Sequence, residues 1–111
     1  DDYEFTGDER LLENAISNII SNAVMYSPKE EKIFIEFIDK YIKIENTGVH
    51  ITEENIKQLF EPFFRVDRSR SKNTGGSGLG LYISKTIFDY HNISYKVKNT
   101  KRGVLFTIEL P

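Results

Sequence analysis

Three asparagines spaced four residues apart stand out in the segment "ENAISNIISNAVMY", residues 13–26. Asn14, Asn18 and Asn22 share one stripe of the helix that the surrounding apolar residues predict. Asparagine is about 0.6 kcal/mol worse than alanine at each helical site, so the stripe has a cost. Amide oxygens can ligate a hard cation or its waters, and amide NH₂ groups can donate to phosphate oxygens. The alternative is a merely exposed polar face, although other polar faces of this chain use Glu, Lys and Arg.

A glycine-rich run, "GGSGLG" at residues 75–80, is the second candidate for chemistry. It does not fit the dinucleotide fingerprint, because the glycine register is wrong and a loop precedes it. It does not fit a P-loop either, since no Lys-Ser or Lys-Thr follows. What remains is a loop that opens directly into a helix, where N–H groups and the helix dipole favour an anion. The alternatives are a flexible hinge or a simple helix cap.

Composition narrows the class of protein. The 111 residues are 39% hydrophobic and 29% charged, which is typical of a single soluble globular domain over residues 1–111. A net charge of −2 gives no reason to expect binding to nucleic acid or to an anionic membrane. The absence of cysteine excludes disulfides, thiol catalysis and cysteine-ligated zinc. No apolar run approaches the roughly 18 residues of a membrane-spanning helix, and no signal peptide is visible.

Helical periodicity predicts two main helices that would carry these groups. The first is expected to begin after Asp8, a favoured N-cap residue. Its apolar face comprises Leu11, Leu12, Ala15, Ile16, Ile19, Ile20, Ala23 and Val24. The second is predicted over residues 79–90. Its inward-facing residues are expected to be Leu79, Ile83, Ile87 and Tyr90.

The remaining segments either alternate apolar and polar residues or lack a regular pattern. Residues 33–37 and 41–45 predict two strands joined by a turn near Asp39, and residues 93–98 and 104–110 predict two more. Thr52 is expected to cap a short helix over residues 53–59. Residues 65–78 show no periodicity and are basic and rich in Ser and Gly, which is typical of a functional loop. This order favours an α+β fold, a two-layer α/β sandwich with a mostly antiparallel sheet.

Four segments in this order resemble the boxes of one family. "NIISNAVMYSP" resembles the N box, "ENTGVHI" the first Gly box, "LFEPFFR" the F box and "GGSGLGLYISKTI" the second Gly box. These are the boxes of the ATP-binding catalytic domain of bacterial sensor histidine kinases, whose Bergerat fold is shared with gyrase-type topoisomerases and heat-shock chaperones. The resemblance covers essentially the whole chain and has the character of the vancomycin-resistance-type sensors. It implies a mixed, mostly antiparallel sheet packed on about three helices.

The resemblance assigns expected ligands and site residues. The cofactors would be ATP and Mg²⁺, with Asn22 ligating the metal and Asn18 close to the metal and phosphates. Tyr26 would adjoin the adenine or ribose, and Asn46 would accept from the adenine amine. The other nucleotide-binding positions would be Gly48 and Ile51 in the first Gly box, and Gly76, Gly78, Leu79 and Gly80 in the second.

The basic loop resembles the ATP lid of this family. Its cations are Arg65, Arg68, Arg70 and Lys72, and one or two of them are expected to contact the β- or γ-phosphate. Together with Asn18, Arg65 is the expected catalytic residue. Phe60 and Phe63 are expected to fold the lid against the body of the domain or its partner helix. The alternative for the cations is a solvated loop.

Three positions depart from the family's pattern. A family lysine falls on Met25, a family aspartate on Asn46 and a family glycine on His50. The Asn46 change removes a negative charge, which could weaken selectivity for adenine over guanine. At His50 the backbone need not take a glycine-only conformation, and a packing or gating role is favoured over catalysis. His91 is expected to cap the C-terminus of the second helix.

The identity of one residue separates the possible reactions. Gyrase-like ATPases carry a water-activating Glu four residues before the metal-binding Asn, whereas this chain has Asn18, which cannot act as a base. The chain is therefore expected to hydrolyse ATP slowly and to deliver the γ-phosphoryl group to a protein histidine. An autonomous ATPase and a degenerate nucleotide-binding module without catalysis are the alternatives.

The resemblance also implies partners. Neither His50 nor His91 lies in the helical His-Glu context of a phosphoacceptor, so that histidine is expected upstream, in a separate dimerisation domain. The other implied partner is a response regulator, and the full-length protein would be a homodimer. The segment would be the cytoplasmic part of a membrane-bound sensor, without membrane or nucleic-acid contact of its own.

Overall fold

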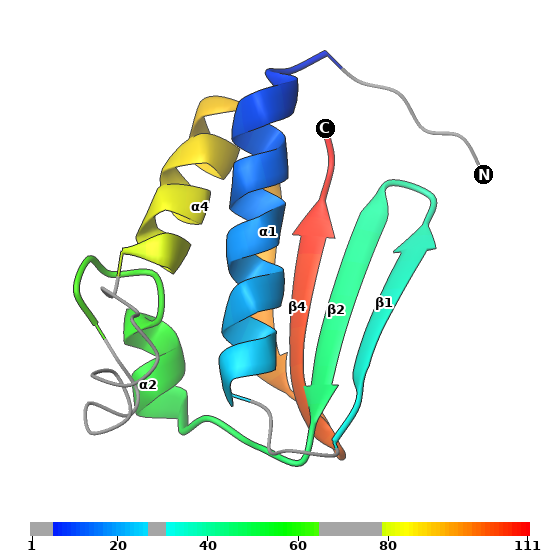
Figure 1. The fold of residues 1–111 in the computed structure, drawn as a ribbon, viewed down its shortest axis with the longest axis vertical. Helices are drawn as coiled ribbons and strands as arrows, with labels where there is room; N and C mark the ends of the chain where they lie inside the picture. Colours follow the sequence, from blue (N-terminus) through cyan, green and yellow to red (C-terminus); the bar gives the residue numbers. More distant parts are fainter. Residues whose placement is uncertain (1–5, 27–30, 65–78) are drawn as a thin grey trace.

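The fold was analysed in a computed structural model that describes residues 6–26, 31–64 and 79–111. Four antiparallel strands form one sheet in the order β1-β2-β4-β3. Their bounds are β1 Ile33–Ile38, β2 Tyr41–Thr47, β3 Ser94–Asn99 and β4 Gly103–Glu109. Helices α1 (Glu9–Tyr26) and α4 (Gly80–Tyr90) lie side by side on one face of the sheet, and the short α2 (Glu53–Gln58) lies near the start of α4 (Figure 1). The predicted two-layer α+β fold is confirmed, and every strand pairing described is antiparallel.

Local capping chemistry sets where the helices begin and end. The Asp8 carboxylate accepts from the Leu11 N–H at 3.1 Å, and the Thr52 hydroxyl accepts from the Asn55 N–H at 3.1 Å. Both N-caps were predicted from residue type. His91 occupies the C-cap of α4, where its Nδ1 donates to the Ile87 carbonyl at 2.8 Å. Its Nε2 accepts from the Asp8 N–H at 3.0 Å, so this cap also ties the end of α4 to the start of α1.

The core lies between the helices and the central strands. Alternate residues of β2 and β4 point toward the helices, and Ile44 pairs with Phe106 at the centre of the sheet. The fully buried apolar side chains of the helices include Ala15, Ile19 and Phe88. Strand β1 lies at the sheet edge beside β2, and Phe37 on it is 74% exposed. The helices therefore cover the central strands rather than the whole sheet. Among the described elements, no helix combines the length and apolar character needed to cross a lipid bilayer.

The predicted inward face of α4 was partly wrong. Ile83 is 40% exposed and Tyr90 is 79% exposed, whereas the buried residues are Leu81, Ser84, Ile87 and Phe88. The physical reason is Ser84, whose hydroxyl donates to the Ala15 carbonyl of α1 at 2.7 Å with no exposed surface. A small polar residue lets the two helices approach closely, and this rotates the buried stripe away from the purely apolar one.

The predicted apolar face of α1 was too wide. Leu11 is 40% exposed and Val24 is 59% exposed, while Ala15, Ile19 and Ala23 are buried. Residues four apart share one contact line, and the helix is covered along that line by the sheet and α4. Leu11 and Val24 lie on the flanks of the line, so they remain in contact with water.

Glycine is required where β4 meets the end of β2. Gly103 pairs with Thr47, and a Cβ added at Gly103 would collide with the carbonyl oxygen of Asn46. This obstacle is backbone rather than the flexible end of a side chain, so the two central strands would have to separate.

We expect Gly103→Ala to lower the free energy of unfolding by about 3 kcal/mol, because the added methyl overpacks a fixed backbone. Chemical denaturation measures this loss. Gly80→Ala is the matched control, since the atoms nearest to its Cβ belong to Asn18 at 3.8 Å or more. A Gly103→Ala variant as stable as the unaltered chain would contradict the close approach.

The turn between β3 and β4 is tied to β2 by Glu45. Its carboxylate accepts from the Thr100 hydroxyl at 2.6 Å and from Arg102 Nε at 2.9 Å. A second guanidinium nitrogen of Arg102 lies 2.7 Å from Glu45 Oε1. The hydrogen bonds from Arg102 and Thr100 lower the pKa of Glu45 below its usual value of 4.5. Glu45 therefore stabilises the fold more when it is ionised than when it is protonated.

A depressed folded-state pKa gives stability that is present above the unfolded-state pKa and lost as the pH falls through the folded value. We therefore expect Glu45→Gln to be less stable than the unaltered chain at pH 7, and the gap to close progressively below pH 4.5. Urea denaturation across pH 2.5–7 checks this, with Glu36→Gln on the exposed edge strand as control. A gap that stays constant with pH would refute the ionic origin.

Candidate functional site

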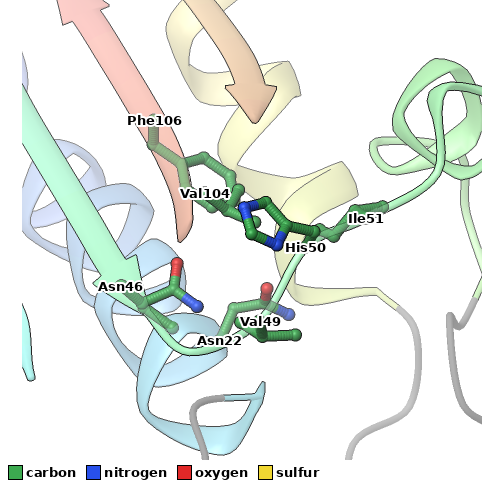
Figure 2. A pocket seen from close by; sticks show the side chains of 8 residues that line it. Asn22, Asn46, Val49, His50, Ile51, Val104 and Phe106 are labelled. Carbon is green, nitrogen blue, oxygen red and sulfur yellow. The ribbon is translucent and has the colours of Figure 1, made fainter. Parts of the chain in front are cut away.

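A pocket opens where β2 ends, between α1 and the loop that follows the strand. Figure 2 shows polar side chains from three separate parts of the chain around it: Asn22 from α1, Asn46 from β2 and His50 from the loop. The complete lining is Asn22, Ala23, Asn46, Val49, His50, Ile51, Val104 and Phe106. Its walls are mostly apolar, with a few polar groups at defined positions, and this composition is typical of small-molecule sites.

Asn46 is the buried polar group of this pocket. Only 3% of its surface is exposed, and its backbone is held by pairing with Ile33 of β1 and Val104 of β4. Its side-chain amide has no hydrogen-bond partner among the described residues. A buried polar group without a partner costs about 1–3 kcal/mol, which a ligand carrying a donor and an acceptor would recover. The amide is thus suited to reading the polar edge of a ring held between the apolar walls.

Gly48 turns the chain after β2. Its φ of +82° lies in the left-handed region, and an added Cβ would collide with the Glu31 side chain. Its N–H donates to the Arg102 carbonyl at 3.0 Å, which holds the turn against the β3–β4 connection. Glycine is favoured here by its backbone conformation, whereas the flexible Glu31 side chain could move aside. The turn brings Val49, His50 and Ile51 to the pocket.

His50 lines the pocket but is an exposed residue. His50 is not among the described residues with positive φ, so its backbone has no need of glycine. Its Nε2 lies 2.9 Å from the Thr100 carbonyl, to which it must donate. One ring nitrogen is therefore engaged by the protein itself. The absence of a glycine-only conformation is confirmed, and the gating role of the ring stays a prediction.

The asparagine stripe of α1 meets the first turn of α4. Asn18 Nδ2 donates to the Gly80 carbonyl at 3.1 Å, and Leu79 is the N-cap residue of α4. The structure therefore brings Asn18, Leu79 and Gly80 together, with Asn22 one helical turn further along α1. Asn14, one turn in the other direction, is exposed and does not line the pocket.

Several predicted site residues lie outside the described residues. These are the lid cations Arg65, Arg68, Arg70 and Lys72, the glycines Gly76 and Gly78, and the side chain of Tyr26. Within the F box, Phe60 packs on the body of the domain, with ring centroids 4.9 Å from Tyr95 and 6.4 Å from Phe106. Phe63 is 71% exposed, with φ of +67°.

Sequence reasoning missed four lining residues: Ala23, Val49, Val104 and Phe106. Alternation along β4 shows that Val104 and Phe106 share a face. It does not show that Val104 pairs with Asn46, because strand order and register are properties of the folded sheet. Val49 could have been inferred from the sequence, because it lies between two residues that the first Gly box already marked.

Comparison with known proteins identifies the family. The model of the histidine kinase-, DNA gyrase B- and HSP90-like ATPases matches residues 7–111. The sensor protein VanSB of Enterococcus faecalis is 42% identical over 108 residues, which cover 94% of this chain and 24% of that protein. The sensor histidine kinase CusS of Escherichia coli K12 is 38% identical over 115 residues, covering 100% of this chain and 24% of that protein. The chain thus spans about a quarter of the length of these curated relatives.

Solved structures give the same result. The mycobacterial sensor histidine kinase MprB matches with a TM-score of 0.77 and 30% identity, covering 95% of this chain and 74% of that one. The catalytic domain of the histidine kinase ThkA matches with a TM-score of 0.74 and 29% identity, covering 95% and 68%. The chain therefore belongs to the family of histidine kinase-, DNA gyrase B- and HSP90-like ATPases, and it has the fold of a histidine kinase catalytic domain.

Proposed function

We propose that this chain, as one domain over residues 1–111, binds ATP with Mg²⁺ and provides the γ-phosphoryl group for a histidine on a separate domain. The observation that carries the proposal is the buried amide of Asn46, which has no hydrogen-bond partner among the described residues and lies in an apolar pocket that Asn22 also lines. A purine base fits both properties, because it has flat apolar faces and a polar edge. The family match over residues 7–111 supports the same ligand.

The base end of the proposed site is the pocket itself. The Asn46 oxygen accepts from the exocyclic amine of adenine, and its NH₂ group donates to a ring nitrogen or an ordered water. The apolar walls, Val49, Ile51 and Phe106 among them, cover the faces of the base. Gly48 permits the close turn that places these walls, and Tyr26 at the end of α1 adjoins the base or ribose.

The phosphate end is proposed along α1 and the head of α4. Because Asn18 Nδ2 donates to the Gly80 carbonyl, the amide has a fixed orientation and its oxygen points away from that carbonyl. The N-terminal end of a helix favours an anion through its dipole, so we expect phosphate oxygens to lie near Leu79 and Gly80, where α4 begins. The other expected phosphate contacts are Gly76, Gly78, Arg65, Arg68, Arg70 and Lys72.

Magnesium is proposed to bind with the nucleotide. Asn22 and Asn18 would hold it through their amide oxygens, with phosphate oxygens and water completing the oxygen ligands that Mg²⁺ requires. No group of three or more His, Asp or Glu that could hold a metal occurs within the described ranges. When bound, the ion neutralises charge on the phosphates during transfer.

The acceptor is proposed to be a histidine outside residues 1–111. His91 has both ring nitrogens engaged, by the Ile87 carbonyl and the Asp8 N–H, and His50 has one engaged by the Thr100 carbonyl. No carboxylate lines the described pocket, so a general base for water is missing there. As in a sensor kinase, the remaining partners would be the protein's own dimerisation domain in a homodimer and a response regulator. The segment would be cytoplasmic, in a membrane-bound protein.

We expect Asn22→Ala to raise the Kd for Mg-ATP at least about tenfold, the effect of losing one interaction worth about 1.4 kcal/mol. Isothermal calorimetry measures the affinity. Asn14→Ala is the matched control, because Asn14 is an exposed asparagine on the same helix. Equal affinities for the two variants would remove Asn22 from the site. Failure of the unaltered chain to bind millimolar Mg-ATP would instead favour a degenerate module.

The reaction is tested by following labelled γ-phosphate. Alone, the chain is expected to release phosphate very slowly, since Asn18 replaces the base that gyrase-like ATPases use. Mixed with its own dimerisation helices, it is expected to label a histidine on them, and the label should be lost on acid treatment. Rapid phosphate release without transfer would favour an autonomous ATPase.

A further inference from the structure

The loop that carries three pocket residues depends on a side chain outside the boxes. Val49, His50 and Ile51 line the pocket, yet they lie in neither helix nor strand. Asn99, the last residue of β3, makes two hydrogen bonds to one residue of this loop. Its Oδ1 accepts from the Ile51 N–H at 2.9 Å, and its Nδ2 donates to the Ile51 carbonyl at 2.6 Å. A side-chain amide thus pairs with Ile51 as a neighbouring strand would.

The residue type follows from this double contact. Ile51 offers one donor and one acceptor, and it is only 8% exposed, so both groups need partners. A short side chain that both accepts and donates at separate atoms is an asparagine amide. An aspartate would place an oxygen against the Ile51 carbonyl, and an alanine would leave both Ile51 groups without their partner.

The β3–β4 turn that follows Asn99 is itself held by hydrogen bonds. The next residue, Thr100, accepts from His50 through its carbonyl and donates to Glu45 through its hydroxyl. Gly48 donates to the carbonyl of Arg102, whose guanidinium binds Glu45. The β3–β4 turn therefore contacts the loop at Gly48, His50 and Ile51, while Glu45 anchors the turn to β2.

We infer that Asn99 is a positioning residue for the base end of the nucleotide site, which rests on the proposed function. It holds Ile51, and with it Val49 and His50, in the wall of the pocket that Asn46 also lines. Asn99 is not among the residues that line the pocket. Its removal loosens one wall of the pocket while the asparagines of α1 and the head of α4 keep their places.

The test compares nucleotide affinity with stability. Asn99→Ala is expected to raise the Kd for Mg-ADP and for Mg-ATP by the same factor, about tenfold, because only base contacts are weakened. Tyr95→Phe is the control, since it removes the Tyr95 hydroxyl bond to Asp89 at 3.1 Å on the same strand without touching the loop. Both variants are expected to lose some thermal stability, and binding is measured well below both melting temperatures.

Each outcome decides between a positioning role and a structural one. An Asn99→Ala variant that melts earlier yet binds both nucleotides within twofold of the unaltered chain would overturn the inference and leave the proposed function standing. Failure of the unaltered chain to bind nucleotide would overturn both. A loss for Mg-ATP without a matching loss for Mg-ADP would also overturn the inference, because it would locate the defect at the γ-phosphate.

Hydrogen exchange in the unaltered chain gives a second test that needs no variant. The Ile51 amide is expected to exchange at least about tenfold more slowly than an exposed amide, since exchange requires its bond to Asn99 to open. Its protection should increase further when Mg-ADP is bound. An Ile51 amide that exchanges as fast as an exposed one would show that the Asn99 contact does not hold the loop, and would overturn the inference.

Discussion

The buried side-chain amide of Asn46, for which the described part of the chain offers no hydrogen-bond partner, constrains the candidate site. Asn46 belongs to β2, which is paired on both sides, so the strand cannot shift to bring the side chain to water. Its own carbonyl is packed against Gly103, which fixes the backbone at this residue. The desolvation cost of the amide is therefore built into the fold. In the proposed function, a ligand that enters beside Asn22 and presents hydrogen-bonding groups to β2 recovers this cost.

Helix α1 joins the two ends of the proposed nucleotide site. It carries Asn22 at the pocket and Asn18 at the head of α4, one turn apart on a single rigid element. The buried bond from Ser84 to Ala15 fixes α4 against α1. The packed helices thus fix Asn22 and Asn18 relative to the head of α4, which are the parts of the proposed site that α1 and α4 carry. The part of the pocket that helices do not fix is the loop after Gly48, which the β3–β4 turn supports instead.

The features that could be predicted from the sequence are those that depend on residues close together along the chain. The caps at Asp8 and Thr52 follow from residue type and are confirmed. The four strands follow from alternation and are present, although their observed bounds differ from the predicted ones by one or two residues. Contacts between distant segments were not visible. The buried face of α4 was predicted wrongly because Ser84 is polar but buried. The bond between Asn99 and Ile51 was not predicted, because nothing in the sequence around Asn99 indicates it. The site residues of the N box and the first Gly box were predicted from the order of the motifs, since no single segment was specific enough.

The exchange of a carboxylate for an amide at Asn46 changes how a base can be selected. A carboxylate only accepts, so it favours the exocyclic amine of adenine and opposes the carbonyl that guanine carries at that position. An amide can rotate and present either its oxygen or its NH₂ group. Charge therefore no longer decides between the two bases in the proposed mode. In that mode, selectivity depends on how rigid the pocket walls are, because a base of the wrong shape must displace Val104 on β4 or the loop at Ile51. Hydrogen bonds hold both of these in place.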